Sequence, residues 1–119
     1  MAVKKKKEKQ RYPLFEFVIK AELNANWVAE YRFHPKRQWR FDYAVPEHMI
    51  AIEIEGGIFA DKRLGHSSGP AIKKDMEKYN MATLMGWRVF RYMPEQTAEC
   101  MDDMKVLKRT IDGKKREKK

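Results

Sequence analysis

Two glutamates, Glu53 and Glu55, lie two positions apart in the isoleucine-rich segment 49–57, MIAIEIEGG. This composition predicts a strand that ends at the two glycines. Side chains two positions apart project from the same face of a strand, roughly 6.6 Å from each other. Two carboxylates that close repel each other unless a cation neutralises them. Because Mg²⁺ and Mn²⁺ prefer carboxylate oxygens, the spacing predicts a divalent-cation site. The alternative is that both glutamates lie on the solvated face of an antiparallel strand.

A third carboxylate, Asp42, lies in the preceding segment 39–45, WRFDYAV, which also has the composition of a strand. Alternation places Phe41 and Tyr43 on one face of this strand and Asp42 on the other. A short turn after it would pair it antiparallel with the next strand and set Asp42 beside Glu53. Three such carboxylates suit Mg²⁺-dependent phosphodiester hydrolysis, in which the metal polarises the phosphate and lowers the pKa of the attacking water. The sequence does not decide between one metal ion and two.

The elements that would position these carboxylates follow the order α-β-β-β-α-β-α. Three strands joined by short turns predict an antiparallel meander, and the whole order predicts an α/β domain whose mixed four-stranded sheet is flanked by helices. The expected helices span 13–24, 70–85 and 94–109, and the expected strands span 27–33, 39–45, 49 to the glycine pair, and 87–92. The helix over 70–85 is expected to carry an apolar stripe formed by Ile72, Met76, Tyr79, Thr83 and Leu84.

The net charge of +9 is concentrated at the two ends of the chain. Residues 1–11 hold six basic side chains and one acidic one, and residues 114–119 hold five and one, so that the body, 12–113, is neutral. We expect two disordered basic tails on one domain. Basic arms on a neutral body favour a polyanionic partner such as DNA. One alternative is that the tails serve only solubility; another is that they contact an anionic membrane surface, for which the sequence offers no basic amphipathic helix.

The remaining composition narrows the class of protein. A chain of 119 residues with 43% hydrophobic side chains is expected to form one domain. No apolar run approaches the roughly 20 residues of a membrane helix, so we expect no membrane partner, and the charged start lacks the apolar region of a secretory signal. The single cysteine, Cys100, excludes an internal disulfide framework and favours a reducing cytoplasm.

Five segments carry a resemblance to a known family. They are 39–47 (WRFDYAVPE), 50–57 (IAIEIEGG), His66, 74–80 (KDMEKYN) and 86–89 (GWRV). Their order and strand context resemble the PD-(D/E)XK nuclease superfamily, and within it the small phage and prophage endonuclease domains related to very-short-patch-repair nucleases. The resemblance covers roughly residues 13–109. It implies a restriction-endonuclease-like α-β-β-β-α-β core, a metal-dependent nuclease activity, and a bacterial or phage-infected host cell.

The resemblance also implies roles for individual residues. The aspartate of the first motif would be Asp42, which follows phenylalanine instead of proline, and the second motif would be the segment 53–55. The lysine usual in that motif is replaced by Glu55, as in the E-x-E variant of some restriction enzymes. That lysine orients or activates the water, or offsets charge on the phosphate. Its candidate replacements are Lys74 and Lys78, one turn apart on the expected helix over 70–85.

Further candidates lie around this motif. The supporting acid that family members often carry on the first helix would be Glu16, with Glu22 as a second choice. His66 lies in the long loop 57–69, where it would act as a general acid or base or bond the phosphate; the alternative is a solvent-exposed loop histidine. The expected DNA-facing elements are the turn 34–38 and the loop 58–68. The basic side chains of these two elements are Lys36, Arg37, Lys62 and Arg63, and the strand that follows the turn adds Arg40.

Three functions follow as hypotheses. The first is a Mg²⁺- or Mn²⁺-dependent endonuclease that cuts DNA through Asp42, Glu53 and Glu55. The second is a structure-selective nuclease, such as a junction resolvase, that works as a homodimer. The third is a catalytically silent nucleic-acid-binding module on the same fold, which the missing motif lysine favours. An RNA substrate stays open, and Lys36 and Arg37 also fit a merely solvated turn.

Overall fold

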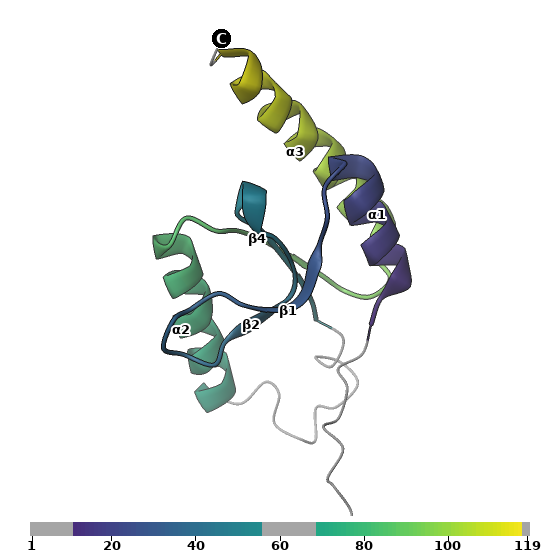
Figure 1. Cartoon of the computed structure of the whole chain (residues 1–119). Coiled ribbons are helices and arrows are strands. Elements are labelled where there is room, and N and C mark those ends of the chain that lie inside the picture. The colour runs from purple at the N-terminus through teal and green to yellow at the C-terminus, as the bar shows by residue number, and fades with distance from the viewer. Residues whose placement is uncertain (1–10, 56–68, 118–119) are drawn as a thin grey trace, which may run out of the picture.

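A computed structural model describes residues 11–55 and 69–117 of the chain, with side chains up to residue 114. It has a mixed α/β fold in which helices flank a four-stranded mixed sheet, as predicted (Figure 1). The elements are α1 (Pro13–Leu23), β1 (Val28–Arg32), β2 (Arg40–Val45), the 3₁₀ helix η1 (Pro46–His48), β3 (Ile50–Ile54), α2 (Gly69–Leu84), β4 (Arg88–Tyr92) and α3 (Thr97–Glu117).

The strand order in the sheet is β1-β2-β3-β4. The first three strands form the predicted antiparallel meander, with Tyr43 of β2 opposite Ile52 of β3. A turn as short as η1 joins only antiparallel neighbours. The last strand, β4, runs parallel to β3 and pairs Phe90 with Ile52, which requires a crossover; α2 provides it. The central strand β3 is therefore paired on both sides.

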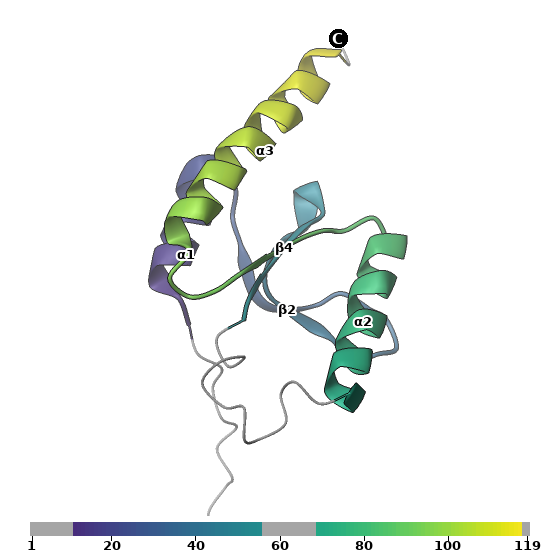
Figure 2. The same ribbon diagram turned by 180° about the vertical axis from the view of Figure 1, so that it is seen from behind.

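Two helices cover one face of the sheet and one covers the other. Figures 1 and 2 show α1 and α3 packed side by side on one face and α2 alone on the opposite face. The three isoleucines of β3, Ile50, Ile52 and Ile54, lie in the larger core cluster with residues of α1 and α3, as their alternation predicts. A smaller cluster lies toward α2 and contains Phe33, Phe41, Ala44, Ala51, Ala82 and Trp87.

The expected alternation of β2 is wrong at one point. Tyr43 packs in the cluster of α1 and α3, but Phe41, two positions earlier, stacks on Phe33 in the other cluster, with ring centroids 4.1 Å apart. The change of face occurs at Asp42, where the regular pairing with β3 ends. In β1, Glu30 lies between the paired Ala29 and Tyr31 and has a left-handed φ of 54°. The break in alternation thus lies where the ladder to β3 ends and where the neighbouring β1 is irregular.

The apolar stripe predicted for α2 does not form the buried face of this helix. Ile72 is 42% exposed, Met76 60% and Leu84 80%, whereas the one buried residue of α2 is Ala82. The small side chain of Ala82 lets the helix approach the sheet closely. The polar side chains of Lys78 and Tyr79 lie on this same side, where both contact Glu53. The orientation of α2 is therefore determined by polar contacts with β3, which apolar periodicity does not detect.

The last helix is longer than predicted. We expected it to end near residue 109 and residues 114–119 to form a disordered tail, but α3 runs from Thr97 to Glu117, so residues 114–117 are helical. Its buried stripe continues from Leu107 to Ile111, one turn further, and carries the helix through Gly113. The other expected tail, 1–11, lies outside the described residues except for its last member. No helix within the described part of the chain is long and apolar enough to cross a membrane.

Ile52→Ala is expected to destabilise the domain by about 2–5 kcal/mol, because Ile52 is 1% exposed in the central strand and its removal leaves a cavity. Ile72→Ala is the matched control on the exposed side of α2, with an expected cost within about 1 kcal/mol. Urea unfolding of both variants and the native protein measures the difference. Equal destabilisation by the two substitutions would contradict the burial of Ile52 and the exposure of Ile72.

Candidate active site

The candidate site is built around a buried carboxylate. Glu53 is 4% exposed and is the one charged residue buried in the described part of the chain. The isoleucines on either side point toward α1 and α3, so strand alternation turns Glu53 toward α2. The alternative of a solvated strand face is therefore wrong for Glu53. A carboxylate in this position must be paired and hydrogen-bonded to be tolerated.

Asp42 lies beside Glu53, as predicted. The regular pairing of β2 with β3 ends at Tyr43 and Ile52, and the two carboxylates take over beyond that point. The Asp42 N–H donates to Glu53 Oε2 at 3.2 Å, and the Ile54 N–H donates to Asp42 Oδ2 at 2.7 Å. Each carboxylate thus accepts a backbone N–H of the neighbouring strand. This exchange joins the two strands through their acidic side chains where the ladder opens.

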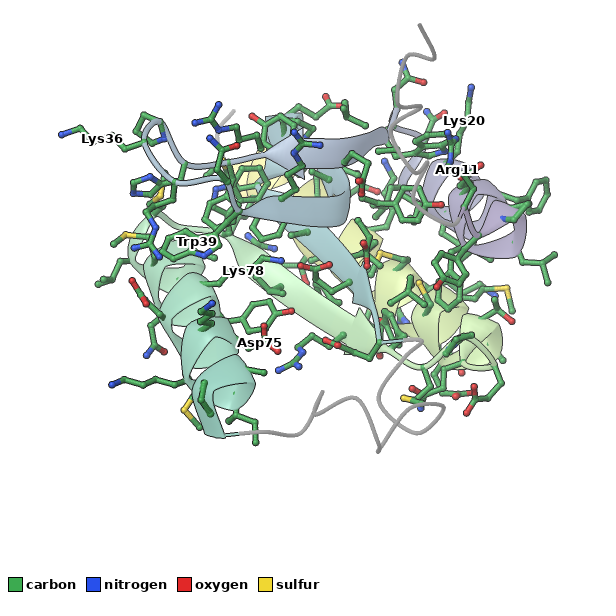
Figure 3. All side chains as sticks on the ribbon, turned by 90° about the horizontal axis from the view of Figure 1, so that it is seen from below. Arg11, Lys20, Lys36, Trp39, Asp75 and Lys78 are labelled. Carbon is green, nitrogen blue, oxygen red and sulfur yellow. The ribbon has the colours of Figure 1, made fainter. Side chains whose placement is uncertain are left out.

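A lysine of α2 provides the opposite charge. Lys78 Nζ donates to Glu53 Oε1 and forms an ion pair with it, while its side chain is only 15% exposed. Figure 3 shows Lys78 extending from α2 toward the sheet. The Phe41 and Tyr79 rings flank the ammonium group, with centroids 5.8 and 5.3 Å from Nζ. Of the two lysines predicted to replace the motif lysine, Lys78 reaches the site. Lys74, one turn earlier, is exposed and has no contact with the carboxylates in the described structure.

The second glutamate is held by a different cation. Arg91 Nε of β4 donates to Glu55 Oε1 at 2.6 Å. The Tyr79 hydroxyl lies 3.4 Å from Glu55 Oε1 and 3.5 Å from Glu53 Oε1, so both glutamates face α2 as their spacing predicts. The Arg91 guanidinium in turn covers the Tyr79 ring, 4.4 Å from its centroid. The five side chains of this site are Asp42, Glu53, Glu55, Lys78 and Tyr79, with Arg91 at its edge.

Sequence reasoning missed Arg91 and treated Tyr79 as a packing residue. The signal for Arg91 is its register: in the parallel pairing of β3 with β4 it lies opposite Glu53. That register is set by the α2 crossover, which local sequence does not reveal. Tyr79 directly follows Lys78 and lies in the helix stripe expected to be apolar. Its hydroxyl was the available clue, because a buried tyrosine usually finds a polar partner.

Burial dominates the electrostatics of the site. It raises the pKa of Glu53 from its ordinary 4.5 to about 7; the neighbouring Asp42 acts in the same direction, and the positive charge of Lys78 opposes both. Burial, followed by the charges of Glu53 and Glu55, raises the pKa of Tyr79 well above its ordinary value. The Tyr79 hydroxyl therefore stays protonated at neutral pH and acts as a donor toward the two glutamates.

The oxygen donors of the site suit a hard divalent cation, but they do not form a preassembled centre. In the described ranges no three carboxylate, histidine or cysteine side chains converge as a metal site. Asp42 and Glu53 are adjacent, whereas Glu55 is turned to Arg91. A Mg²⁺ or Mn²⁺ ion at these carboxylates would compete with two existing ion pairs, Lys78–Glu53 and Arg91–Glu55.

The structure does not bring the predicted supporting acid into this group. Glu16 lies on α1, on the opposite side of the sheet, where its Oε2 accepts from Arg11 Nε at 2.5 Å and from the Tyr43 hydroxyl at 2.6 Å. Desolvation and Glu16 raise the pKa of Tyr43 to about 12, whereas Arg11 lowers the pKa of Glu16. The second choice, Glu22, is on the same helix. Three further candidates lie outside the described residues: His66, Lys62 and Arg63.

The basic turn between β1 and β2 is connected to α2. Arg37 forms an ion pair with Glu77 at 2.5 Å, and its guanidinium covers the Trp39 ring, 3.9 Å from its centroid. Glu77 immediately precedes Lys78, so the turn adjoins the candidate site. Lys36 is exposed at the tip of the turn (Figure 3). Arg40, at the start of β2, is also exposed.

No match was found in the comparisons of this chain with protein-family models, with curated proteins and with solved structures. The geometry of the chain itself therefore carries the functional argument.

In metal-free buffer, the native protein is expected to lose stability as the pH rises from about 4.5 to about 7. Within that window the folded protein holds the Glu53 proton, since burial raises the pKa of this carboxyl, and the unfolded chain has already released it. Glu53→Gln removes this titration, so the free energy of unfolding should change less between pH 5 and pH 8 in this variant than in the native protein. Urea titrations of both proteins measure it. Parallel pH profiles would contradict the stated environment of Glu53.

Lys78→Met is expected to destabilise the protein by about 3 kcal/mol at pH 8, because it leaves Glu53 buried without its cation. The cost should shrink at pH 5, where Glu53 is protonated. Lys74→Met is the matched control from the exposed side of the same helix, with an expected effect within about 0.5 kcal/mol. Thermal and urea unfolding at the two pH values distinguish the lysines. The ion pair has no stabilising role if both variants unfold alike.

Proposed function

We propose that this protein is a metal-dependent endonuclease that hydrolyses phosphodiester bonds in DNA, on a restriction-endonuclease-like fold. The observation that carries the proposal is the buried Glu53, which joins the Asp42 backbone and Lys78 at the opening between β2 and β3. A carboxylate pair with a lysine held against it fits the residue roles that the PD-(D/E)XK resemblance implies. The element order α-β-β-β-α-β supports the same fold.

The residues present fit a hard divalent ion in the type of their donors. Asp42, Glu53 and Glu55 would hold Mg²⁺ or Mn²⁺, which when bound polarises the phosphate and lowers the pKa of a water molecule. Lys78 holds a positive charge against the carboxylates and can donate to a phosphate oxygen or orient the attacking water. Arg91 balances the charge of Glu55, which occupies the position of the usual motif lysine.

The basic side chains around the site suit contact with a DNA backbone. The turn at 34–38 is connected to α2 by the pair of Arg37 and Glu77, next to Lys78, and it exposes Lys36. Arg40 begins the strand that carries Asp42. Phosphate contacts of this kind position a duplex without reading its sequence. In this proposal Lys62, Arg63 and His66 act from the segment that precedes α2 in the sequence, and the enzyme works in the cytoplasm.

One observation favours a second candidate, the catalytically silent nucleic-acid-binding module. Both glutamates already have a cationic partner inside the fold, Lys78 for Glu53 and Arg91 for Glu55. Such pairing lets carboxylates lie close together without a metal ion. The two candidates differ in what Mg²⁺ does: it enables cutting in the nuclease and leaves the module unchanged.

Glu53→Gln is expected to abolish metal-dependent cleavage, because it replaces the central carboxylate of the site by an amide. The measurement compares linear, nicked, mismatched, branched and single-stranded DNA with the native protein in Mg²⁺ and in Mn²⁺. Glu99→Gln, on an exposed position in the first turn of α3, is the control and should cut normally. Preference for branched DNA together with a dimer on gel filtration would support the junction-resolving form.

Lys78→Met should lower the cleavage rate by about 100-fold or more, because it removes the positive charge held at the carboxylates. Lys74→Met should leave the rate near that of the native protein. DNA binding without cutting by the native protein, in both metals and on every substrate, would exclude the nuclease and favour the silent module.

A further inference from the structure

A second group of charged side chains lies in a pocket that shares no residue with the candidate active site. The pocket has a volume of about 470 Å³ and is open to solvent. Its wall includes three basic side chains, two apolar ones and one acid: His48, Arg88, Lys114, Met49, Ile111 and Glu47. They come from η1, the start of β4 and the last turns of α3. Volumes of roughly 300–1,000 Å³ are typical of small-molecule sites.

The pocket is separate from the candidate active site. In the parallel pairing of β3 and β4, Arg88 lies opposite Ile50 at the start of both strands, whereas Arg91 lies opposite Glu53 near their end. Three residues span roughly 10 Å along a strand, and side chains three apart project from opposite faces. Arg91 accordingly faces α2 and Glu55, while Arg88 lines the pocket with Ile111 of α3. Figure 2 shows α3 extending past this end of the sheet.

Arg88 is the informative residue of the pocket. It is half-buried, yet its guanidinium makes no hydrogen bond or ion pair with any described residue. Polar groups taken out of solvent are normally hydrogen-bonded, and no fully buried polar atom within the described ranges lacks a partner. The donors of Arg88 are therefore left accessible, and Arg88 lines both this pocket and a smaller neighbouring one that contains Asp103. In the larger pocket they are available to a ligand that enters it.

Charge and shape indicate the chemistry of that ligand. Arg88 and Lys114 bring two positive charges to one pocket, and the imidazole of His48 adds a nitrogen. The one acid in the described lining, Glu47, is 63% exposed at its side chain and lies 4.0 Å from His48, so it offsets little of the charge inside. A guanidinium offers paired donors that match a phosphate, and a phosphate monoester carries nearly two negative charges at pH 7.

We propose that this pocket binds a phosphate monoester, held by Arg88 and Lys114. The volume exceeds what a bare phosphate needs, and the apolar side chains of Met49 and Ile111 provide a surface for the organic part of the ligand. The shared chemistry is a terminal phosphoryl group. It comes either from a free nucleoside monophosphate or from the 5′-phosphorylated end of a nucleic-acid strand, and the two sources are separated by experiment.

The test uses the full chain carrying Glu53→Gln, in chelator, so that cleavage plays no part and a failure of the nuclease proposal leaves this result intact. Four probes are titrated by calorimetry: inorganic phosphate, AMP, a short 5′-phosphorylated single strand, and the same strand without its phosphate. Arg88→Gln and Lys114→Gln are each expected to weaken binding of the phosphorylated probes about tenfold or more. Arg109→Gln and Lys105→Gln on α3, outside the pocket lining, are the matched controls and should bind as before.

A second readout locates the ligand. With methyl-labelled methionine, the signal of Met49 should shift more than those of the other described methionines when a phosphorylated probe binds. Lys114 is exposed on a helix, so Lys114→Gln tests the pocket even where Arg88→Gln impairs folding. AMP binding as tightly as the phosphorylated strand assigns the site to free nucleotides, and preference for the strand assigns it to strand ends. Either result supports the monoester site.

Three results would overturn the proposal. The first is no binding of any phosphorylated probe. The second is binding that Lys114→Gln and a folded Arg88→Gln leave unchanged. The third is equal affinity for the strand with and without its 5′-phosphate, since that points to general attraction of the backbone and not to a site for a terminal phosphoryl group.

Discussion

The burial of one carboxylate is the constraint on which the rest of this structure depends. Glu53 lies between the sheet and α2, where an unpaired charge would cost several kcal/mol. It is tolerated because the Asp42 N–H and Lys78 Nζ each donate to one of its oxygens. Those two bonds fix where β2 separates from β3 and which side of α2 faces the sheet. The exposure of Ile72 and Met76 follows, since they lie on the side of the helix turned away.

Features that depend on neighbours in sequence were predictable. The alternation of the isoleucines placed Ile52 in the core and turned Glu53 and Glu55 to one side, and a short turn was enough to set Asp42 beside Glu53. Composition and spacing also predicted the order of elements and the mixed sheet. The isoleucine alternation and the position of Asp42 each rest on one strand or on two strands joined directly.

Features that depend on distant pairing were not predictable. Phe41 lies on the other face where the β2–β3 ladder opens, and carboxylates of both strands bridge the opening. Arg91 enters the site through the parallel register of β4, which α2 sets. Residues 114–117 are helical because Ile111 extends the packed stripe of α3 by one turn. Local charge indicated a tail there, and tertiary packing overrode it.

The two arginines of β4 show how one strand separates two kinds of electrostatic site. Arg91 pairs with Glu55 on the α2 side of the sheet, where Lys78 pairs with Glu53 beside Asp42. A nucleic-acid phosphate that approaches these carboxylates would be favoured by a divalent cation bound between them. Arg88 projects on the other side, where Lys114 adds to its charge in the pocket and the acid of that pocket, Glu47, is exposed. An anion needs no metal ion to bind at that end. Arg88 and Arg91 are three residues apart on β4, so strand geometry places them toward opposite ends of the strand and on opposite faces of the sheet. This placement alone separates the proposed anion site from the carboxylate site.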